Sequence, residues 1–232
     1  AASDVYKRQG KYYIQSKLGT VLDVTSASAA AGTNVQTYTF NQSTAQKWTL
    51  LETEKTLYSI MGKTNVSVSQ MVKFYKNKAT VSYPYSNVSE APTIEKFCQI
   101  YKEESEVEGV KAEVAFAQAM METGFLKFGG DVKKDQYNFA GIGAIGGGSS
   151  GAKFDSIRIG IRAHVQHLKA YASKEALKQP VVDPRFQYVK RGSAEYVQWL
   201  GQKENPNGYG WATAKNYGNN IVKLYILPMK KY

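Results

Sequence analysis

Residues 117–125 read "AQAMMETGF", and Glu122 is the only charged residue among them. They end an apolar segment that starts at Val110, and this segment would place apolar side chains on nearly every face of a helix. Such a helix is expected to be buried. A Gly-rich, partly polar loop follows at once, which is typical of a cleft wall. The segment therefore predicts a buried helix whose end delivers one carboxylate to a cleft.

Glu122 is a candidate general acid. Burial at the end of an apolar helix would disfavour its charged form and raise its pKa. A carboxylic acid that stays protonated near neutral pH can donate a proton to a glycosidic oxygen. The alternative interpretation is a glutamate at a helix end that simply reaches solvent. The buried helix and the Gly-rich loop favour the first interpretation.

Helical patterns dominate the chain beyond residue 92. Residues 93–110 begin with Thr93 as an N-cap residue and reach Gly109 at their C-terminal end. Further helices are expected over residues 68–77, 154–173, 193–201 and 211–227. Residues 11–40 differ, because apolar and polar residues alternate there between Gly, Ser and Asn, as in short strands joined by turns. The fold class predicted is mainly α, with a short N-terminal all-β segment.

Composition places the chain among ordinary globular proteins. Of its 232 residues, 43% are apolar and 21% are charged. No apolar run reaches the roughly 18 residues that a membrane span needs, so no span is expected. Cys98 is the only cysteine, which rules out an intrachain disulfide and leaves stability to packing.

The formal net charge of +11 is concentrated in the larger part of the chain. Residues 1–53 carry 5 basic and 3 acidic side chains, a net of +2, and residues 54–232 carry 25 and 16, a net of +9. This excess favours a polyanionic partner. Nucleic acid is not expected, because no basic amphipathic helix, P-loop or RNA-binding signature accompanies the charge.

The N-terminal stretch carries three short motifs in order: "LDV" at 22–24, "GTNVQTY" at 32–38 and "QKW" at 46–48. They resemble one subdomain of a ricin-type β-trefoil lectin, whose core tryptophan would be Trp48. The resemblance implies that Asp23 and Gln36 bond sugar hydroxyls, that Tyr38 stacks on a sugar ring, and that Gln46 supports Asp23. The alternative is that Asp23 only caps a turn and Tyr38 only packs on the surface. A trefoil closes from three such units, so one repeat is expected to be a fragment of a lectin domain.

The segments "AFAQAMMETGF" at 115–125 and "KKDQYNFAGIGA" at 133–144 resemble the bacterial endo-β-N-acetylglucosaminidases of glycoside hydrolase family 73. That family has Gln-Ala-x-x-Glu-[Ser/Thr]-Gly at a helix end and then a loop with Asn-x-[Phe/Ala]-Gly-Ile. A third match, "WATAKNYGNNIVKL" at 211–224, is the closing segment in which a tyrosine, here Tyr217, faces the catalytic glutamate. The resemblance implies a lysozyme-like fold with Glu122 as general acid.

The sequence offers more than one candidate for the second catalytic group. The segment "GAIGGGSSGAKF" at 143–154 replaces the β-hairpin that the family has after its loop. Nearby carboxylates are Asp131, Asp135 and Asp155; Asp131 is preferred, and Asp155 is interpreted as a helix N-cap. The substrate's own N-acetyl group is an alternative nucleophile. In that case Tyr217 would help to hold the acetamido group or the attacking water.

The remaining expectations concern substrate contacts and metals. The substrate-binding residues expected are Gln118, Asn138, Phe139, Gly141, Tyr209 and Trp211, the last two as stacking platforms for sugar rings. His164 and His167 are three positions apart on a helix but lack an accompanying ligand set, so neither a metal nor another cofactor is expected.

Together these features predict a lectin repeat over 1–53, a connecting region with a short helix over 54–92 and a glucosaminidase catalytic domain over 93–232. The expected protein is secreted and cell wall-associated. Its expected partners are peptidoglycan glycan strands, with other cell-wall carbohydrate at the lectin repeat, and the bond cleaved joins N-acetylglucosamine to N-acetylmuramic acid. The alternatives are a muramidase or lytic transglycosylase, and a non-catalytic glycan-binding protein.

Overall fold

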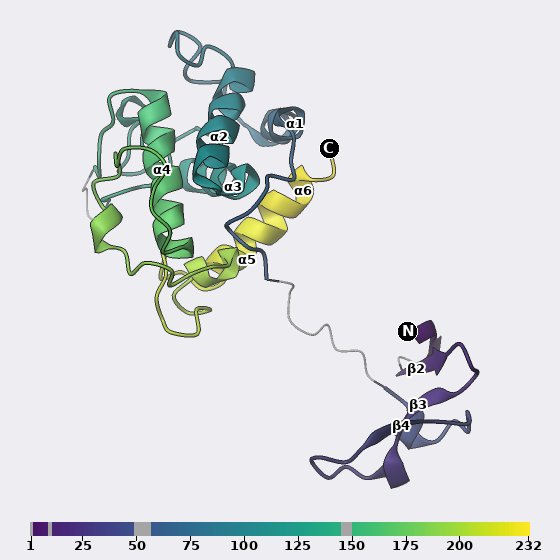
Figure 1. Ribbon diagram of the computed structural model, residues 1–232. Coiled ribbons are helices and arrows are strands. Elements are labelled where there is room, and N and C mark those ends of the chain that lie inside the picture. The colour runs from purple at the N-terminus through teal and green to yellow at the C-terminus, as the bar shows by residue number, and fades with distance from the viewer. Residues whose placement is uncertain (1, 9–10, 49–56, 145–149) are drawn as a thin grey trace. The chain divides into compact units, whose positions relative to one another are not determined.

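The computed structural model describes residues 2–8, 11–48, 57–144 and 150–232, with the backbone alone described for residues 2–8 and 11. The chain forms two compact units, Ala1–Thr56 and Leu57–Tyr232 (Figure 1). The boundary expected at residue 53 lies outside the described residues. We describe each unit by itself.

The N-terminal unit contains an antiparallel sheet with the strand order β1-β2-β3-β4. The strands are β1 (Ala2–Arg8), β2 (Lys11–Ser16), β3 (Val21–Val24) and β4 (Val35–Tyr38). The register pairs Asp23 with Gln36 and Val21 with Tyr38. On β3, Val21 and Asp23 are buried because alternate residues point to the same face. The short strands predicted from the alternating pattern are confirmed.

The second unit is helical and encloses α3 (Figure 1). Its α-helices are α1 (Val68–Lys78), α2 (Ile94–Glu108), α3 (Ala112–Thr123), α4 (Ile157–Ala172), α5 (Tyr217–Asn220) and α6 (Leu227–Met229). A π-helical segment, η6 (Ile221–Ile226), joins α5 to α6. The helix α3 contacts α1, α2, α4 and η6. Short 3₁₀ turns occupy residues 134–136, 186–188 and 197–200.

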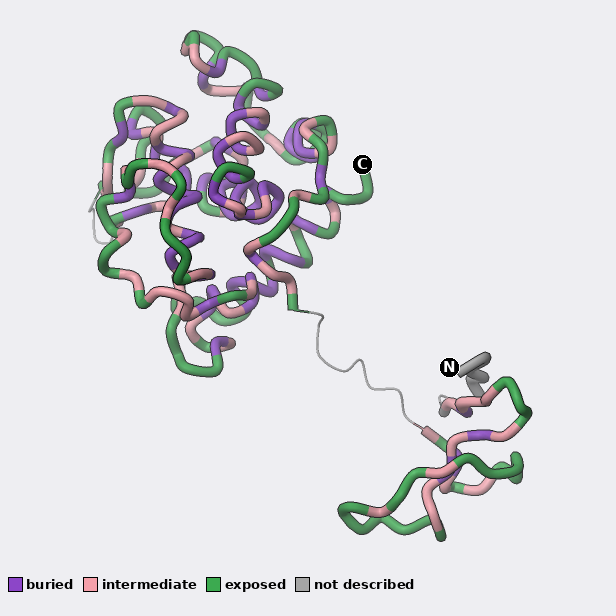
Figure 2. Tube along the Cα trace, in the orientation of Figure 1, coloured by how far each residue is buried: buried purple, intermediate pink, exposed green. Residues whose placement is uncertain are grey.

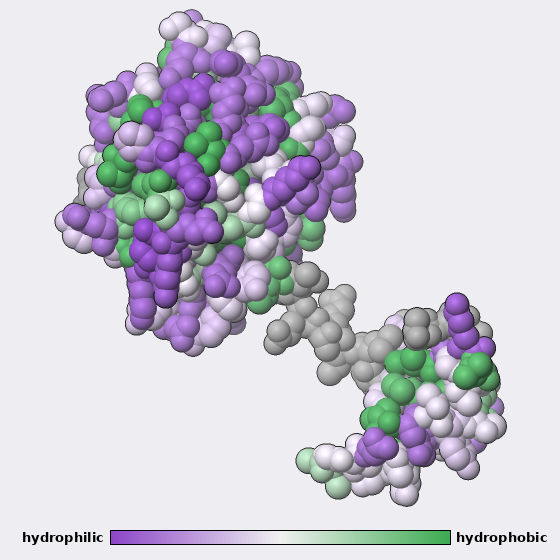
Figure 3. Space-filling view, in the orientation of Figure 1, coloured by the Kyte–Doolittle hydropathy of each residue, from purple (hydrophilic) through white to green (hydrophobic). Residues whose placement is uncertain are grey.

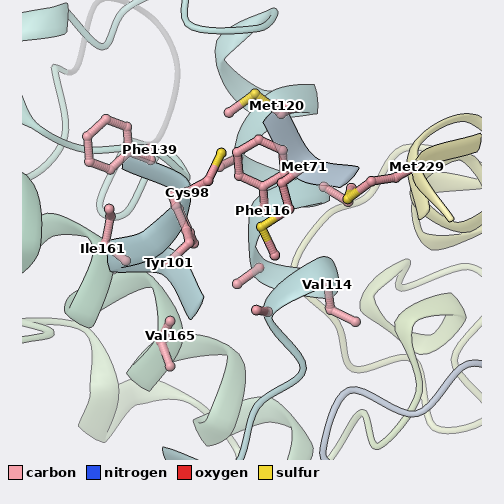
Figure 4. Close-up of a cluster of buried hydrophobic side chains, with 14 of the residues drawn as sticks. Met71, Cys98, Tyr101, Val114, Phe116, Met120, Phe139, Ile161, Val165 and Met229 are labelled. Carbon is pink, nitrogen blue, oxygen red and sulfur yellow. The ribbon is translucent and has the colours of Figure 1, made fainter. Parts of the chain in front are cut away.

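The core surrounds α3, as its sequence predicts. Phe116 and Met120 have no exposed surface, and Figure 2 shows buried residues along this helix. Figure 4 shows side chains from α1, α2, α4 and α6 gathered around them, including Met71, Cys98 and Met229. Because the core packs closely around most of α3, the helix is held rigidly and its C-terminal end has a fixed position.

The ends of α2 follow the sequence signals. The Thr93 side chain accepts a hydrogen bond from the backbone N–H of Lys96, and Gly109 adopts the left-handed conformation, with φ of 74°. The side of the helical unit in Figure 3 is mainly hydrophilic. Among the described residues, no helix combines the length and the apolar character that crossing a membrane requires.

Two helix predictions are wrong in extent. Residues 193–201 form only a 3₁₀ turn, Val197–Leu200, because the backbone at Tyr196 is extended and bridges to Ser59. The last helix begins at Tyr217 and not at 211, since Ala212 forms a parallel bridge with Gly201. In both places, backbone pairing with another segment outweighs the local helical pattern.

The region expected to connect the domains packs with the helical unit from Leu57 onward. Its helix, α1, begins with a capping box in which Ser67 and Gln70 bond each other's backbone N–H. Met71 and Phe74 on α1 are fully buried, and α1 contacts α2, α3 and α6. Residues 57–92 are therefore a structural part of the helical unit.

Two glycines allow α4 and α5 to approach the backbone of other segments closely. A methyl group at Gly160 on α4 would lie 1.8 Å from the carbonyl oxygen of Tyr137. A methyl group at Gly218 on α5 would lie 1.9 Å from the carbonyl oxygen of Val197. Both distances are impossible for a side chain, so only glycine permits α4 and α5 to approach these segments so closely.

Candidate active site

The helix α3 ends in an unusual turn that exposes Glu122. Gly124, Phe125 and Leu126 all have positive φ, of 58°, 58° and 63°. The Thr123 hydroxyl supports this turn, since it donates to the carbonyl of Ala119 at 2.7 Å and accepts from the N–H of Leu126 at 2.9 Å. Left-handed backbone costs about 1–2 kcal/mol for a residue other than glycine. The turn directs the chain away from the helix axis immediately after Glu122.

A pocket of about 260 Å³ lies at this helix end. Its lining includes Glu122, Asp131, Asn138 and Gly141. The structure thus brings together the glutamate motif, the loop motif and the preferred second carboxylate. The expectation that Glu122 is buried is wrong in one respect, because its side chain is exposed at the pocket while the helix behind it is buried.

The surrounding protein nevertheless raises the pKa of Glu122 above its ordinary value. Desolvation by the protein raises this pKa, and a hydrogen bond from the Tyr217 hydroxyl to Glu122 Oε1 opposes the shift. One side of the carboxyl opens to the pocket and protein covers its other sides, which accounts for both the exposed side chain and the raised pKa. Glu122 therefore has access to a ligand and a bias toward the protonated form.

Tyr217 is buried and carries two hydrogen bonds at its hydroxyl. It donates to Glu122 and accepts from Gln118 Nε2 at 2.8 Å. Burial raises the pKa of Tyr217 well above its usual value, and the charge of Glu122 raises it further. Tyr217 thus remains a neutral donor facing Glu122, as the resemblance implied.

The hydrogen bonds continue inward from Gln118. Its Oε1 atom lies 2.9 Å from His164 Nε2, and His164 Nδ1 lies 3.2 Å from the Tyr101 hydroxyl. Complete burial lowers the pKa of His164 to about 3, so the imidazole is neutral. We call Tyr101, His164, Gln118, Tyr217 and Glu122 the donor chain.

The donor chain has one consistent direction. Gln118 uses its amide N–H₂ on Tyr217, which leaves its carbonyl oxygen to accept from His164 Nε2–H. His164 Nδ1 then accepts from Tyr101. Every proton therefore points toward Glu122. The sequence indicated Gln118 as a substrate contact, but the structure buries it completely and makes it a link to Tyr217.

Asn138 fastens the loop over residues 138–144, the Asn138 loop, which lines the same pocket as Glu122. Its Nδ2 donates to the carbonyls of Ile142 at 2.9 Å and Ala152 at 3.1 Å, and its Oδ1 accepts from the N–H of Ile142 at 2.9 Å. Gly141 within this loop has φ of 65°. Asn138 lines the pocket, but these bonds occupy its polar atoms, so its role in the structure is to hold the loop.

Phe139 differs from the expectation of a substrate contact. Its side chain is 0% exposed and packs against Phe97, with ring centroids 5.1 Å apart, and against Tyr85 and Tyr101. Phe139 anchors the Asn138 loop in the core. It has no surface to offer a ligand.

The three nearby carboxylates have different positions. Asp131 lines the pocket with Glu122, and its side chain is exposed. Asp135 lies in the 3₁₀ turn at 134–136. Asp155 is not the N-cap of α4; Ser156 takes that place, with its hydroxyl accepting from the N–H of Ile159 at 3.3 Å. Residues 145–149, part of the segment that replaces the hairpin, lie outside the described residues.

The two aromatic candidates, Tyr209 and Trp211, have different surroundings. Tyr209 is 41% exposed, and the Lys190 ammonium lies 3.8 Å from the centre of its ring. Trp211 is half-buried, with its ring 4.6 Å from that of His167. Trp211 lines a second pocket of about 210 Å³, which also contains Gly141.

The N-terminal unit gathers three of the four residues expected to bind sugar. Gln36 Nε2 donates to Asp23 Oδ1 at 3.2 Å, and Gln46 Nε2 donates to Asp23 Oδ2 at 3.1 Å. Asp23 and Gln46 are buried, whereas Tyr38 is exposed. Trp48 is half-buried and bonds the carbonyl of Leu22 at 3.0 Å. Asp23 therefore joins β3 to β4 and to the segment before Trp48.

Two groups at the site were not indicated by the sequence. The first is the link from His164 to Gln118, for which the only signal is a polar residue in each of two buried helices. The second is the pair of His167 Nδ1 and Asp183 Oδ2, 2.6 Å apart, beside Arg185. These residues come from separate segments, so sequence spacing could not reveal their contact. No group of three or more His, Cys, Asp or Glu able to hold a metal occurs within the described ranges.

Comparison with known families gives two matches. The family model described as mannosyl-glycoprotein endo-beta-N-acetylglucosaminidase matches residues 98–226. This span contains the donor chain, Asp131 and the Asn138 loop. A model of the ricin-type beta-trefoil lectin domain-like family matches residues 4–81. The second match extends beyond Thr56 and includes α1, which packs in the helical unit.

Comparison with individual proteins adds a relative and two solved structures. An uncharacterized protein of Borreliella burgdorferi is 46% identical over 132 residues, which are 57% of this chain and 61% of the relative's length. The structure of S. aureus autolysin E in complex with a muropeptide is 20% identical, with a TM-score of 0.48, covering 75% of this chain and 72% of that one. A catalytic mutant of that autolysin in complex with the disaccharide NAG-NAM is 17% identical, with a TM-score of 0.48 and 82% coverage of both chains.

Proposed function

The chain belongs to the mannosyl-glycoprotein endo-beta-N-acetylglucosaminidase family, and on this premise we propose that it is a peptidoglycan hydrolase. The bond cleaved is the β-1,4 bond between N-acetylglucosamine and N-acetylmuramic acid. The observation that carries the proposal is the carboxyl of Glu122, which opens to a pocket, has a raised pKa and accepts a hydrogen bond from Tyr217.

Glu122 acts as the general acid in this proposal. Its proton moves to the glycosidic oxygen as the bond to the anomeric carbon breaks, and the leaving sugar departs as an alcohol. The raised pKa keeps the proton available, and the Tyr217 hydroxyl stabilises the carboxylate that remains. Gln118 and His164 act behind Tyr217 as positioning residues.

The positive charge that develops on the sugar ring is removed when a nucleophile bonds to the anomeric carbon, and there are two candidate nucleophiles. Asp131 lies in the same pocket as Glu122 and would direct a water molecule to the anomeric carbon. Alternatively, the substrate's own acetamido oxygen would form the bond to this carbon, and water would open the resulting ring. In the second route, Asp131 contributes only a nearby negative charge.

The chain as a whole would act in the cell wall. A net charge of +11 suits a matrix that carries anionic polymers and peptide carboxylates. The repeat containing Asp23, Gln36 and Tyr38 would add carbohydrate contacts through its exposed tyrosine. Under this proposal, the protein is secreted and binds the wall through both of its units.

Analysis of the products tests this function directly. Purified cell walls are digested with the full chain, and the soluble muropeptides are examined by mass spectrometry after reduction. New reducing ends of N-acetylglucosamine are expected. Reducing-end or anhydro N-acetylmuramic acid would instead identify a muramidase or lytic transglycosylase. Walls that retain the protein without releasing fragments would identify a non-catalytic binder.

Two variants complete the experiment. Glu122→Gln should release no fragments, because the amide cannot donate the required proton. Glu195→Gln makes the same chemical change at an exposed side chain that lines a different pocket. It should digest walls at the wild-type rate, which shows that loss of one carboxylate alone does not abolish activity.

A further inference from the structure

A second pocket lies beside the one that contains Glu122. Gly141 and Ala144 line both, so the Asn138 loop forms their common wall. At Gly141 this wall is only backbone, since the residue has no side chain. A glycan held with its scissile bond at Glu122 can therefore pass over Gly141, and its neighbouring groups would enter the second pocket.

Aromatic rings and a cation line this second pocket. Tyr171, Tyr188 and Trp211 supply the rings, and the Tyr171 and Trp211 ring centroids are 5.7 Å apart. Such rings offer flat apolar faces of the kind that pack against sugar rings. Arg185 supplies the cation, with its guanidinium carbon 4.6 Å from the centre of the Tyr188 ring.

Arg185 has no acidic partner in the part of the chain that the structure describes. Its guanidinium is exposed and forms no ion pair there, in contrast to Arg158 and Arg162, which are paired with glutamates. Asp183 is nearby but engaged: Oδ2 pairs with His167 Nδ1 at 2.6 Å, and Oδ1 accepts the backbone N–H of Arg185 at 2.8 Å. The guanidinium donors thus remain available to a ligand.

The free guanidinium determines which ligand fits. Its planar fork of N–H groups matches the two oxygens of a carboxylate, and its contact with the Tyr188 ring places it at the pocket. A neutral sugar would use the aromatic faces but leave these donors unmatched. The pocket is therefore suited to an acidic substituent on a sugar chain.

We propose that the pocket formed by His167, Tyr171, Arg185, Tyr188 and Trp211 binds a carboxylate carried by the glycan next to the cleaved bond. The inference rests on the proposed function and adds a specificity to it. The carboxylate has two possible sources, the lactyl group of N-acetylmuramic acid or the peptide attached to that group. Arg185 is the residue that selects acidic chains over neutral ones.

Binding to an inactive full-length chain tests the inference. Titration calorimetry on Glu122→Gln measures the affinity for three oligosaccharides of equal length: one of N-acetylglucosamine only, one with free lactyl carboxylates, and one with peptides on the lactyl groups. Arg185→Gln in the same background should weaken binding of at least one acidic ligand by roughly 10- to 100-fold, which is the range for a lost hydrogen bond to a charged group. Arg185→Lys should lose less, because it keeps the charge but not the fork.

The pattern of losses identifies the source. A loss confined to the ligand with free lactyl groups assigns the site to the lactyl carboxylate, and a loss confined to the peptide-bearing ligand assigns it to the peptide. Lys223→Gln removes one exposed charge from η6 and should change no affinity, which controls for net charge. Equal loss on all three ligands, or no loss on either acidic ligand, overturns the inference. Wild-type protein that releases nothing from walls would instead overturn the proposed function.

Discussion

His164 Nε2 lies 2.9 Å from Gln118 Oε1, and both side chains are fully buried although they come from different helices, α4 and α3. The contact fixes the histidine tautomer and the orientation of the Gln118 amide. In this orientation the Gln118 amide N–H₂ faces the Tyr217 hydroxyl. The hydroxyl oxygen accepts from Gln118, and the hydroxyl proton is donated to Glu122. A packing contact deep in the core thus orients a group that touches Glu122.

Glu122→Gln should change both rate and stability. We expect a loss of activity of roughly 10²–10⁴-fold on soluble glycan fragments, which is typical of removing general acid–base catalysis. The folded pKa of Glu122 is raised above the ordinary 4.5, so its stabilising contribution is complete below that pH and is lost as the pH rises through the folded pKa. The amide has no such loss. Melting temperatures at pH 4 and pH 7 should therefore favour the variant more strongly at pH 7. A difference that does not change with pH would contradict the raised pKa.

Tyr217→Phe should shift the pH profile of kcat/KM to higher pH, whereas simple loss of an acidic group would not. The Tyr217 hydrogen bond lowers the pKa of Glu122, so its removal raises that pKa further. Because a general acid works while protonated, the alkaline limb of kcat/KM should shift to higher pH even though the rate falls. Tyr225→Phe is the matched control, since Tyr225 lies near Glu122 but is stacked on Phe125. A limb that stays in place in Tyr217→Phe would show that the hydroxyl does not act on Glu122.

His164→Gln should flatten the acid dependence of stability. Burial lowers the folded pKa of His164 from 6.5 to about 3, so its contribution is complete above pH 6.5 and is lost as the pH falls toward 3. The variant cannot bind this proton, and its free energy of unfolding should fall less steeply over that range. At neutral pH it should be less stable by about 1–3 kcal/mol, because Tyr101 or Gln118 loses a buried partner.

The same variant separates positioning from packing. If the donor chain orients Tyr217, kcat should fall while KM changes little, and the alkaline limb should shift as it does in Tyr217→Phe. Urea unfolding at several pH values and kinetics on soluble fragments provide both readouts. A variant that is destabilised but has wild-type kcat and an unshifted limb would reduce His164 to a packing residue.

Asp131→Asn tests the second catalytic group. If Asp131 positions the attacking water, the rate should fall by roughly 10²–10⁴-fold, as in Glu122→Gln. Asp135→Asn, four positions away in a 3₁₀ turn, is the control and should retain its rate. A loss of less than about tenfold in Asp131→Asn would assign the nucleophile to the acetamido group of the substrate.

The helical unit should work without the N-terminal unit. A protein of residues 57–232 should hydrolyse soluble glycan fragments at the full-length rate, because the donor chain, Asp131 and Asn138 all lie within one compact unit. Its melting temperature should match that of the corresponding transition in the full chain. Failure of this fragment to fold would show that the helical unit needs the sheet.

The sequence predicts most of the features that depend on residues within a single helix. It identifies α3 from its apolar faces, and α2 from Thr93 and Gly109, because these signals are local. It overestimates helix at 193–201 and before Tyr217, where pairing of the backbone with other segments decides the structure. Period and propensity contain no information about such partners.

The motif residues show a similar division. Their positions indicate that Glu122, Asn138 and Tyr217 belong to one site, and the structure places them around one pocket or in contact with it. The motif does not tell which of its members face the pocket. Phe139 and Gln118 point into the core, since the loop and the helix each need an inward anchor.

Gly160 and Gly218 set how closely α4 and α5 pack against neighbouring backbone. Gly160 brings α4 against the carbonyl of Tyr137, the residue before Asn138. Gly218, the residue after Tyr217, brings α5 against the carbonyl of Val197. An added methyl group at either position would lie less than 2 Å from that carbonyl oxygen, so the helix and the facing segment would have to separate. The placement of Asn138 and Tyr217 therefore depends on two residues that have no side chain and do not line the pocket with Glu122. Screens that vary only the residues facing the ligand would overlook both positions.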